Sequence, residues 1–183
     1  MIHVLPKNGA KALLMPLFWS SCIGLLGPMS FSIPFLSVPF IIQNLAFVLV
    51  AMHLGVEGAL MMAGWFLLEG ISGFPFFSHG RSGIGMLLGP SGGYLLGYVL
   101  AAYASAYLAQ RFPYLRGKVL ALISGLFAIL LSGWIHLSFW VGMGPAFFQG
   151  IVPFVAWDLI KACIGVAFLH RLEKVPTTPK HLS

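Results

Sequence analysis

Residues 70–94, GISGFPFFSHGRSGIGMLLGPSGGY, constrain the fold of this chain more than any other segment. They include eight glycines and two prolines, yet the segment is apolar and Arg81 is its one charged residue. A transmembrane helix does not survive that density, because Gly costs conformational entropy and Pro lacks a backbone donor. Irregular backbone at membrane depth is tolerated where it is buried in protein or lines a cavity. We therefore interpret the segment as a folded cap over a site, with an ordinary external loop as the alternative.

The rest of the chain has the composition of an integral membrane protein. Of its 183 residues, 59% are hydrophobic and only 8% are charged, whereas soluble domains carry about 25% charged residues. At about 20 residues a span, the length allows one domain of roughly six helices, covering residues 1–183. We expect a multi-pass protein of the plasma membrane, embedded in the lipid bilayer. The net charge of +6 does not indicate nucleic-acid binding, because the basic residues fall in loops, where they set topology.

Apolar runs separated by Gly, Pro and polar residues predict an all-α fold of six transmembrane helices. We expect them at about residues 12–27, 40–54, 58–71, 92–110, 118–137 and 151–170. The first three are short for a core of about 30 Å. We therefore expect the loops after the first and third helices to fold back into membrane depth.

The basic residues predict the orientation. With six spans, eight of them fall on one side of the membrane: Lys7, Lys11, Arg111, Arg116, Lys118, Arg171, Lys174 and Lys180. Arg81 falls on the other side, and Lys161 lies within a span. Because positive charge accumulates on the cytoplasmic side, both termini are predicted to be cytoplasmic, and the long glycine-rich loop between helices three and four to be external.

Asp158 and Lys161 form the sharpest pair of candidate site residues. A spacing of three places them on one face of the last helix. Ionisable residues inside a membrane are costly and usually mark a pathway or a ligand site. The alternative is an internal salt bridge that only packs the bundle. Asp158 lies about two turns from the external end, so both residues could face a cavity that opens outward beneath the cap.

One cation and one carboxylate suggest a small ligand with an anionic end and a hydrogen-bond donor elsewhere. Arg81 offers a second cation, with a fork suited to a carboxylate. Neutral polar contacts could come from Gln43, Asn44, His79, Ser91 and Tyr94. The aromatic residues Trp134, Phe139, Trp140 and Trp157 could wall an apolar ring, or could form an interfacial belt.

Two other functional classes can be weighed from the residues. The segment GPSGGY is not a phosphate loop, because no Gly-Lys-Ser/Thr follows it, so the chain is not expected to hydrolyse ATP itself. No spacing of metal ligands is present either. Residues 89–92 match the short G-x-S-G pattern of rhomboid serine proteases, with Ser91 as the nucleophile. That reading needs a histidine base, and His136 is the one geometric candidate.

Three segments together resemble one family. Residues 70–97 resemble the pattern G-x-x-G-x-P-x-F followed by L-x-G-P-T-G-G-Y-L-x-G, with Ser91 in place of the threonine. VPFIIQNL, residues 38–45, and PFVAWDLIK, residues 153–161, are similar to two further motifs in the same order. The chain is identified by these motifs as a member of the BioY family, the biotin-binding S components of energy-coupling factor (ECF) transporters.

The resemblance implies a function and a site. It implies that the protein captures biotin near the external face, beneath the 70–94 loop, as the substrate-specific part of a vitamin importer. Biotin would be the transported ligand, with no cofactor and no enzymatic activity, and energy would come from a membrane T component and two ATPases. The implied binding residues are His79, Gly80, Arg81, Ser91, Gly92, Gly93, Tyr94, Asp158 and Lys161. Another small vitamin-like acid stays open as the ligand.

Overall fold

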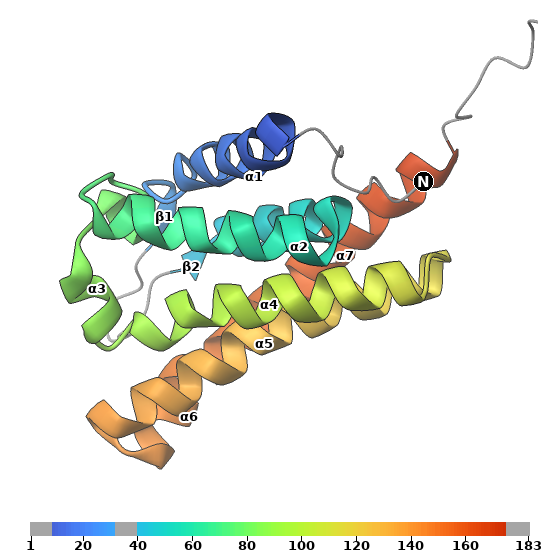
Figure 1. Cartoon of the computed structure of the whole chain (residues 1–183). Helices are drawn as coiled ribbons and strands as arrows, with labels where there is room; N and C mark the ends of the chain where they lie inside the picture. The colour runs from blue at the N-terminus through green and yellow to red at the C-terminus, as the bar shows by residue number, and fades with distance from the viewer. Residues whose placement is uncertain (1–8, 32–39, 175–183) are drawn as a thin grey trace, which may run out of the picture.

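The computed structural model of the chain describes residues 9–31 and 40–174. The longer helices of this part form a bundle (Figure 1): α1 (Gly9–Gly24), α2 (Gln43–Ile71), α4 (Gly92–Arg111), α5 (Leu115–Val141) and α7 (Val152–Lys174). The shorter elements are the 3-10 turn η1 (Ser78–Gly80), α3 (Ile84–Leu88), α6 (Met143–Gly150), and the strands β1 (Ser30–Phe31) and β2 (Phe40–Ile41). The two strands form one short antiparallel ladder. The all-helical fold predicted from the sequence is confirmed.

Several of these helices have the length and composition of membrane spans. Within the described residues, three stretches are long and apolar enough to cross a bilayer: Gln43–Ile71, Leu115–Val141 and Met143–Arg171. Leu13–Gly24 is a shorter apolar helix. The helix α4 falls outside this set and packs against both α2 and α5. Its buried face carries small residues, among them Ala101, Ala102 and Ser105, which let neighbouring helix backbones approach closely.

The helix α2 is a hairpin and not a straight rod. Gly55 has φ 76° and ψ 174°, which no helix contains and which suits a residue without a Cβ. The rings of Phe47 and Phe66 lie 6.1 Å apart, whereas 19 helical residues in a straight line would separate them by about 28 Å. The chain therefore reverses at Gly55, so that the legs 43–54 and 56–71 lie side by side. The sequence predicted this break between residues 54 and 58.

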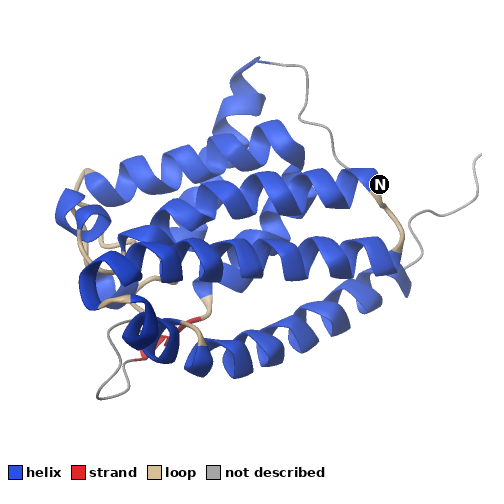
Figure 2. Cartoon of the chain, turned by 90° about the horizontal axis from the view of Figure 1, so that it is seen from below, coloured by secondary structure: helices blue, strands red, loops and turns tan. Residues whose placement is uncertain are grey.

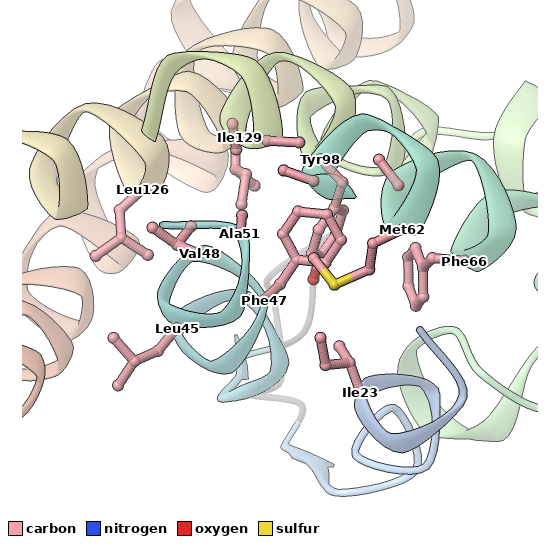
Figure 3. Packing of buried hydrophobic residues seen from close by; sticks show 14 of the residues in the cluster. Ile23, Leu45, Phe47, Val48, Ala51, Met62, Phe66, Tyr98, Leu126 and Ile129 are labelled. Atoms are coloured by element: carbon pink, nitrogen blue, oxygen red, sulfur yellow. The ribbon is translucent and has the colours of Figure 1, made fainter. Parts of the chain in front are cut away.

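A cluster of aromatic rings holds the hairpin to α4 (Figure 3). The ring of Tyr98 lies 4.7 Å from that of Phe47 and 5.0 Å from that of Phe66. Phe66 also contacts Phe77 of the glycine-rich loop at 5.8 Å. The contacts of Phe47 with Tyr98 and of Phe66 with Phe77 are edge-to-face, a geometry that fixes ring orientation as well as burying apolar area. The loop is therefore anchored in the same core as the helices.

The short elements gather at one end of the bundle. In Figure 1, β1, β2, α3 and α6 lie toward the end where α2 finishes and α4 begins. Figure 2 shows the strands at that end from a second direction. The helix α1 begins and α7 finishes toward the opposite end, where the connection between α4 and α5 also lies. Because α1 begins and α7 finishes toward the same end, the arrangement agrees with an even number of membrane crossings. Which side of the membrane each end faces stays a prediction.

Several helix ends differ from those expected. The helix predicted from residue 40 begins at Gln43, because Phe40 and Ile41 pair with β1. The first helix ends at Gly24 because residues 25–28 form turns. The last two predicted helices extend further, to Val141 and Lys174. Most of the predicted loop 28–39, Val38 and Pro39 of the second motif, Lys7, and the tail beyond Lys174 lie outside the described residues.

Candidate functional site

A cavity lies between α2, α4, α5 and α7, against the folded glycine-rich loop. Thirteen residues line it: Gln43, Asn44, Ser78, Met86, Ser91, Tyr94, Leu95, Tyr98, Ile129, Leu130, Phe154, Asp158 and Lys161. Apolar and aromatic side chains form most of the wall, and the polar groups are few. This is the usual composition of a site for a small organic ligand, in which a few polar groups fix its orientation.

The base of the cavity holds a buried ion pair. The ammonium group of Lys161 contacts the carboxylate of Asp158 three residues earlier on α7. It also donates a hydrogen bond of 2.9 Å to Oδ1 of Asn44, at the start of α2. Lys161 is only 1% exposed. Because each charge lies against its opposite, the pair is tolerated at a depth where a lone ion would be costly.

Helix geometry gives the cavity its depth. Ser91 directly precedes α4, Leu95 and Tyr98 follow it at spacings of four and three, and all three line the cavity. Seven residues of helix correspond to about 10 Å. Phe154, Asp158 and Lys161 repeat the same spacing on α7. The contact of 6.2 Å between the rings of Tyr94 and Phe154 shows that the two helices begin at the same end. Tyr98 therefore lies about 10 Å along the helix from Ser91, and Lys161 lies about 10 Å along α7 from Phe154.

The glycine-rich loop covers this end through its backbone. Gln43 is buried, and its Nε2 donates to the carbonyl oxygens of Ile23 at 2.8 Å and Phe76 at 2.9 Å. The backbone N–H of Gly83 donates to the carbonyl of Gly70 at 2.8 Å and closes the loop on itself. The first turn of α2 thus ties the end of α1 to the loop, and Ser78 and Met86 of the loop reach the cavity.

The structure brings six of the eleven predicted site residues together and places the other five elsewhere. The six that line the cavity are Gln43, Asn44, Ser91, Tyr94, Asp158 and Lys161. His79 and Arg81 are exposed, and Gly80 lies between them at φ 67°. Gly92 and Gly93 are buried against the backbone of α3 and the side chain of His136, where a Cβ would collide. Those five are thus placed as parts of the surrounding loop and helix start.

Seven lining residues were not predicted: Ser78, Met86, Leu95, Tyr98, Ile129, Leu130 and Phe154. Helical spacing carried a signal for three of them. Leu95 and Tyr98 are four and seven residues after Ser91, and Phe154 is four before Asp158. Ile129 and Leu130 could not be predicted in this way, because α5 carries apolar residues all around its circumference and no predicted site residue from which to count.

The protease arrangement is absent from this site. Nε2 of His136 lies 3.0 Å from the carbonyl oxygen of Gly89, so the imidazole bonds the backbone of the turn and not the hydroxyl of Ser91. Among the described residues, no group of three or more His, Cys, Asp or Glu side chains could hold a metal ion.

Membrane-spanning helices around a small-molecule cavity with a charged base define a ligand-binding membrane protein. The BioY family model matches residues 5–177, so the chain belongs to the BioY family. Curated relatives agree with this membership. The biotin transporter BioY of Thermotoga maritima is 34% identical over 79% of this chain and 86% of its own length. The probable biotin transporter BioY of Pyrococcus horikoshii is 33% identical over 74% of this chain and 81% of its own length.

A solved structure has the same fold. The S-component for biotin from an ECF-type ABC transporter superposes with a TM-score of 0.80 at 26% identity, covering 93% of this chain and 96% of that one. The resemblance seen in the sequence motifs is therefore confirmed. The names of these relatives describe transport components, and none of them describes an enzyme.

Proposed function

We propose that this protein binds biotin in the cavity described above and serves as the substrate-specific component of a biotin importer in the plasma membrane. The named relatives are biotin transporters, and the cavity has the polarity that biotin requires. Biotin combines a cyclic urea and a sulfur ring with an apolar chain that ends in a carboxylate. The apolar chain and ring match the walls, where Leu95, Ile129 and Phe154 lie.

The single observation that carries this proposal is the ion pair between Asp158 and Lys161 at the base. A urea offers N–H donors and a carbonyl acceptor along one short edge, so it can meet a carboxylate and an ammonium group together. A carboxylate in the same place would gain from Lys161 but would be repelled by Asp158. The urea ring of biotin therefore occupies the base, and its carboxylate points toward the end where Ser78 and Ser91 lie.

Equilibrium binding of labelled biotin to the purified protein tests this function. We expect tight binding by the parent and its loss in Asp158→Asn and Lys161→Ala. Glu57→Gln is the matched control, because Glu57 is an exposed acid outside the cavity lining. Binding that survives in both site variants would mean that the pair is structural. No binding by the folded parent would exclude biotin, and other small acids should then be screened.

Biotin methyl ester tests the orientation. If the urea meets Lys161, Lys161→Ala weakens binding of the acid and of the ester by the same factor. If the carboxylate meets Lys161, the variant weakens the acid far more than the ester. Arg81→Ala is the companion variant, since Arg81 is the exposed cation of the cap and would affect the acid selectively if it pairs with the carboxylate.

The energising partners follow from the same assignment. ECF-type S components work with a membrane T component and two ATPases, as the family resemblance implies, and this chain has no phosphate loop of its own. Biotin uptake by cells that express the chain alone, or together with such a module, tests this. Uptake that is equal in both cases would show that the protein transports without them.

A further inference from the structure

Tyr98 carries a buried hydroxyl that the protein leaves unsatisfied. The residue is 1% exposed, and within the described part of the chain its hydroxyl oxygen has no hydrogen-bond partner. Its ring packs against those of Phe47 at 4.7 Å and Phe66 at 5.0 Å, so this packing sets where the hydroxyl oxygen lies. Buried polar atoms in native proteins are nearly always paired, because an unpaired one loses its hydration without compensation.

The neighbouring tyrosine on the same helix shows the contrast. The hydroxyl of Tyr94 donates to the carbonyl oxygen of Gly150 at 3.0 Å, so its hydrogen bond is made within the protein. Both tyrosines line the cavity, but Tyr98 lies one helical turn deeper, among the residues of the base. Tyr98, whose hydroxyl has no partner, and the ion pair of Asp158 and Lys161 therefore belong to residues that line the same cavity.

We infer that the hydroxyl of Tyr98 is reserved for the ligand and donates a hydrogen bond to the carbonyl oxygen of its cyclic urea. This inference rests on the proposed binding of biotin. The urea N–H groups need an acceptor, and the carboxylate of Asp158 is the strongest one that lines the cavity. The urea oxygen needs donors, and a phenol is a good donor. Tyr98 is thus a specificity-determining residue that recognises a carbonyl oxygen at the head of the ligand.

Tyr98→Phe tests the inference because it removes only the hydroxyl. The variant removes a group without a partner in the unliganded protein, so we expect its unliganded melting temperature to hold or rise. We expect its affinity for biotin to fall about tenfold, which corresponds to about 1.4 kcal/mol. Tyr103→Phe is the matched control, since Tyr103 is an exposed tyrosine of the same helix, and it should change neither quantity.

An analogue identifies the atom that Tyr98 contacts. In 2-iminobiotin the urea is replaced by a cyclic guanidine, which is protonated at neutral pH, so the nitrogen in place of the urea oxygen carries only hydrogens and the acceptor is lost. Tyr98→Phe should therefore weaken biotin about tenfold but 2-iminobiotin hardly at all. A loss of the same factor for both ligands would overturn the assignment of the hydroxyl to the urea oxygen.

The outcomes separate this inference from the proposed function. If Tyr98→Phe lowers the melting temperature and leaves biotin affinity unchanged, the hydroxyl is structural and the inference is wrong, while biotin binding stands. If the parent protein does not bind biotin, the proposed function fails, and the inference fails with it. If Tyr98→Phe lowers the affinity for biotin without lowering the unliganded melting temperature, and weakens biotin more than 2-iminobiotin, the result supports both the inference and the proposed function.

Discussion

The Nζ atom of Lys161 lies 2.9 Å from Oδ1 of Asn44, so a residue of α7 and one at the start of α2 share a hydrogen bond across 117 positions of sequence. The same oxygen accepts the backbone N–H of Leu45 at 3.0 Å. Asn44 therefore joins the charged pair of the last helix to the first leg of the hairpin, and the geometry of the cavity base depends on both helices.

Replacement of this acceptor should destabilise the protein. In Asn44→Ala the buried ammonium group of Lys161 loses one of its partners, at a cost of about 1–3 kcal/mol. We expect a lower melting temperature in detergent, measured without ligand. Leu49→Ala is the control, because it removes no polar partner, so its change in melting temperature measures the loss of packing alone. An unchanged melting temperature in Asn44→Ala would show that Lys161 does not depend on Asn44 for its hydrogen bonding.

The hydroxyl of Tyr94 should contribute to stability, in contrast to that of Tyr98. Tyr94→Phe removes the hydrogen bond to the carbonyl oxygen of Gly150 and leaves that oxygen without this donor. The expected loss is about 1 kcal/mol, seen as a lower melting temperature. If Tyr94→Phe and Tyr98→Phe have equal effects on the unliganded protein, the difference between the two hydroxyls is contradicted.

Gly93 should not tolerate a side chain. A Cβ at this position would lie 2.2 Å from Cβ of His136 and 2.6 Å from the carbonyl oxygen of Ser132, so α4 and α5 would have to separate. We expect Gly93→Ala to lower the yield of folded protein and its melting temperature. Gly64→Ala is the matched control, because nothing lies within 4 Å of its Cβ position. That variant should gain up to about 1 kcal/mol from helix propensity. Comparable effects at both positions would refute the close contact.

The carboxylate of Glu69 should hold α1 to the hairpin. The hydroxyls of Ser20 and Ser21 each donate to one of its oxygens at 2.6 Å. We expect the double variant Ser20→Ala, Ser21→Ala to leave this carboxylate unpartnered and to loosen α1. Hydrogen exchange of the α1 backbone measures this directly. Faster exchange confined to α1 is the expected result, whereas uniform or unchanged exchange would contradict it.

The sequence predicted the features that depend on local chemistry. The break near Gly55, the glycine-rich cap and the common face of Asp158 and Lys161 follow from residue type and helical spacing, and the structure has all three. Contacts between distant segments could not be predicted in this way. The pairing of Lys161 with Asn44 depends on how α2 lies against α7, and the burial of Tyr98 depends on rings from both legs of the hairpin.

The direction of the Arg81 side chain could not be predicted from residue type, and its contact with a ligand carboxylate stays a prediction. Its guanidinium group suits a carboxylate, and its position in the cap suggested a place in the site. The structure instead leaves Arg81 exposed and outside the cavity lining. The direction of a loop side chain is set by backbone turns, here the positive φ of His79 and Gly80, and the residue types alone do not specify that sequence of turns.

The position of Lys161 along α7 has a consequence for translocation. It lies nine residues beyond Val152, where the helix begins, which is about 14 Å of helix, or nearly half of a hydrocarbon core of about 30 Å. With the cap on the external side, as the basic residues predict, a molecule seated against this lysine would have crossed about half the thickness of the barrier. The remaining step is short, and a modest tilt or separation of helices at the far end would shorten it further.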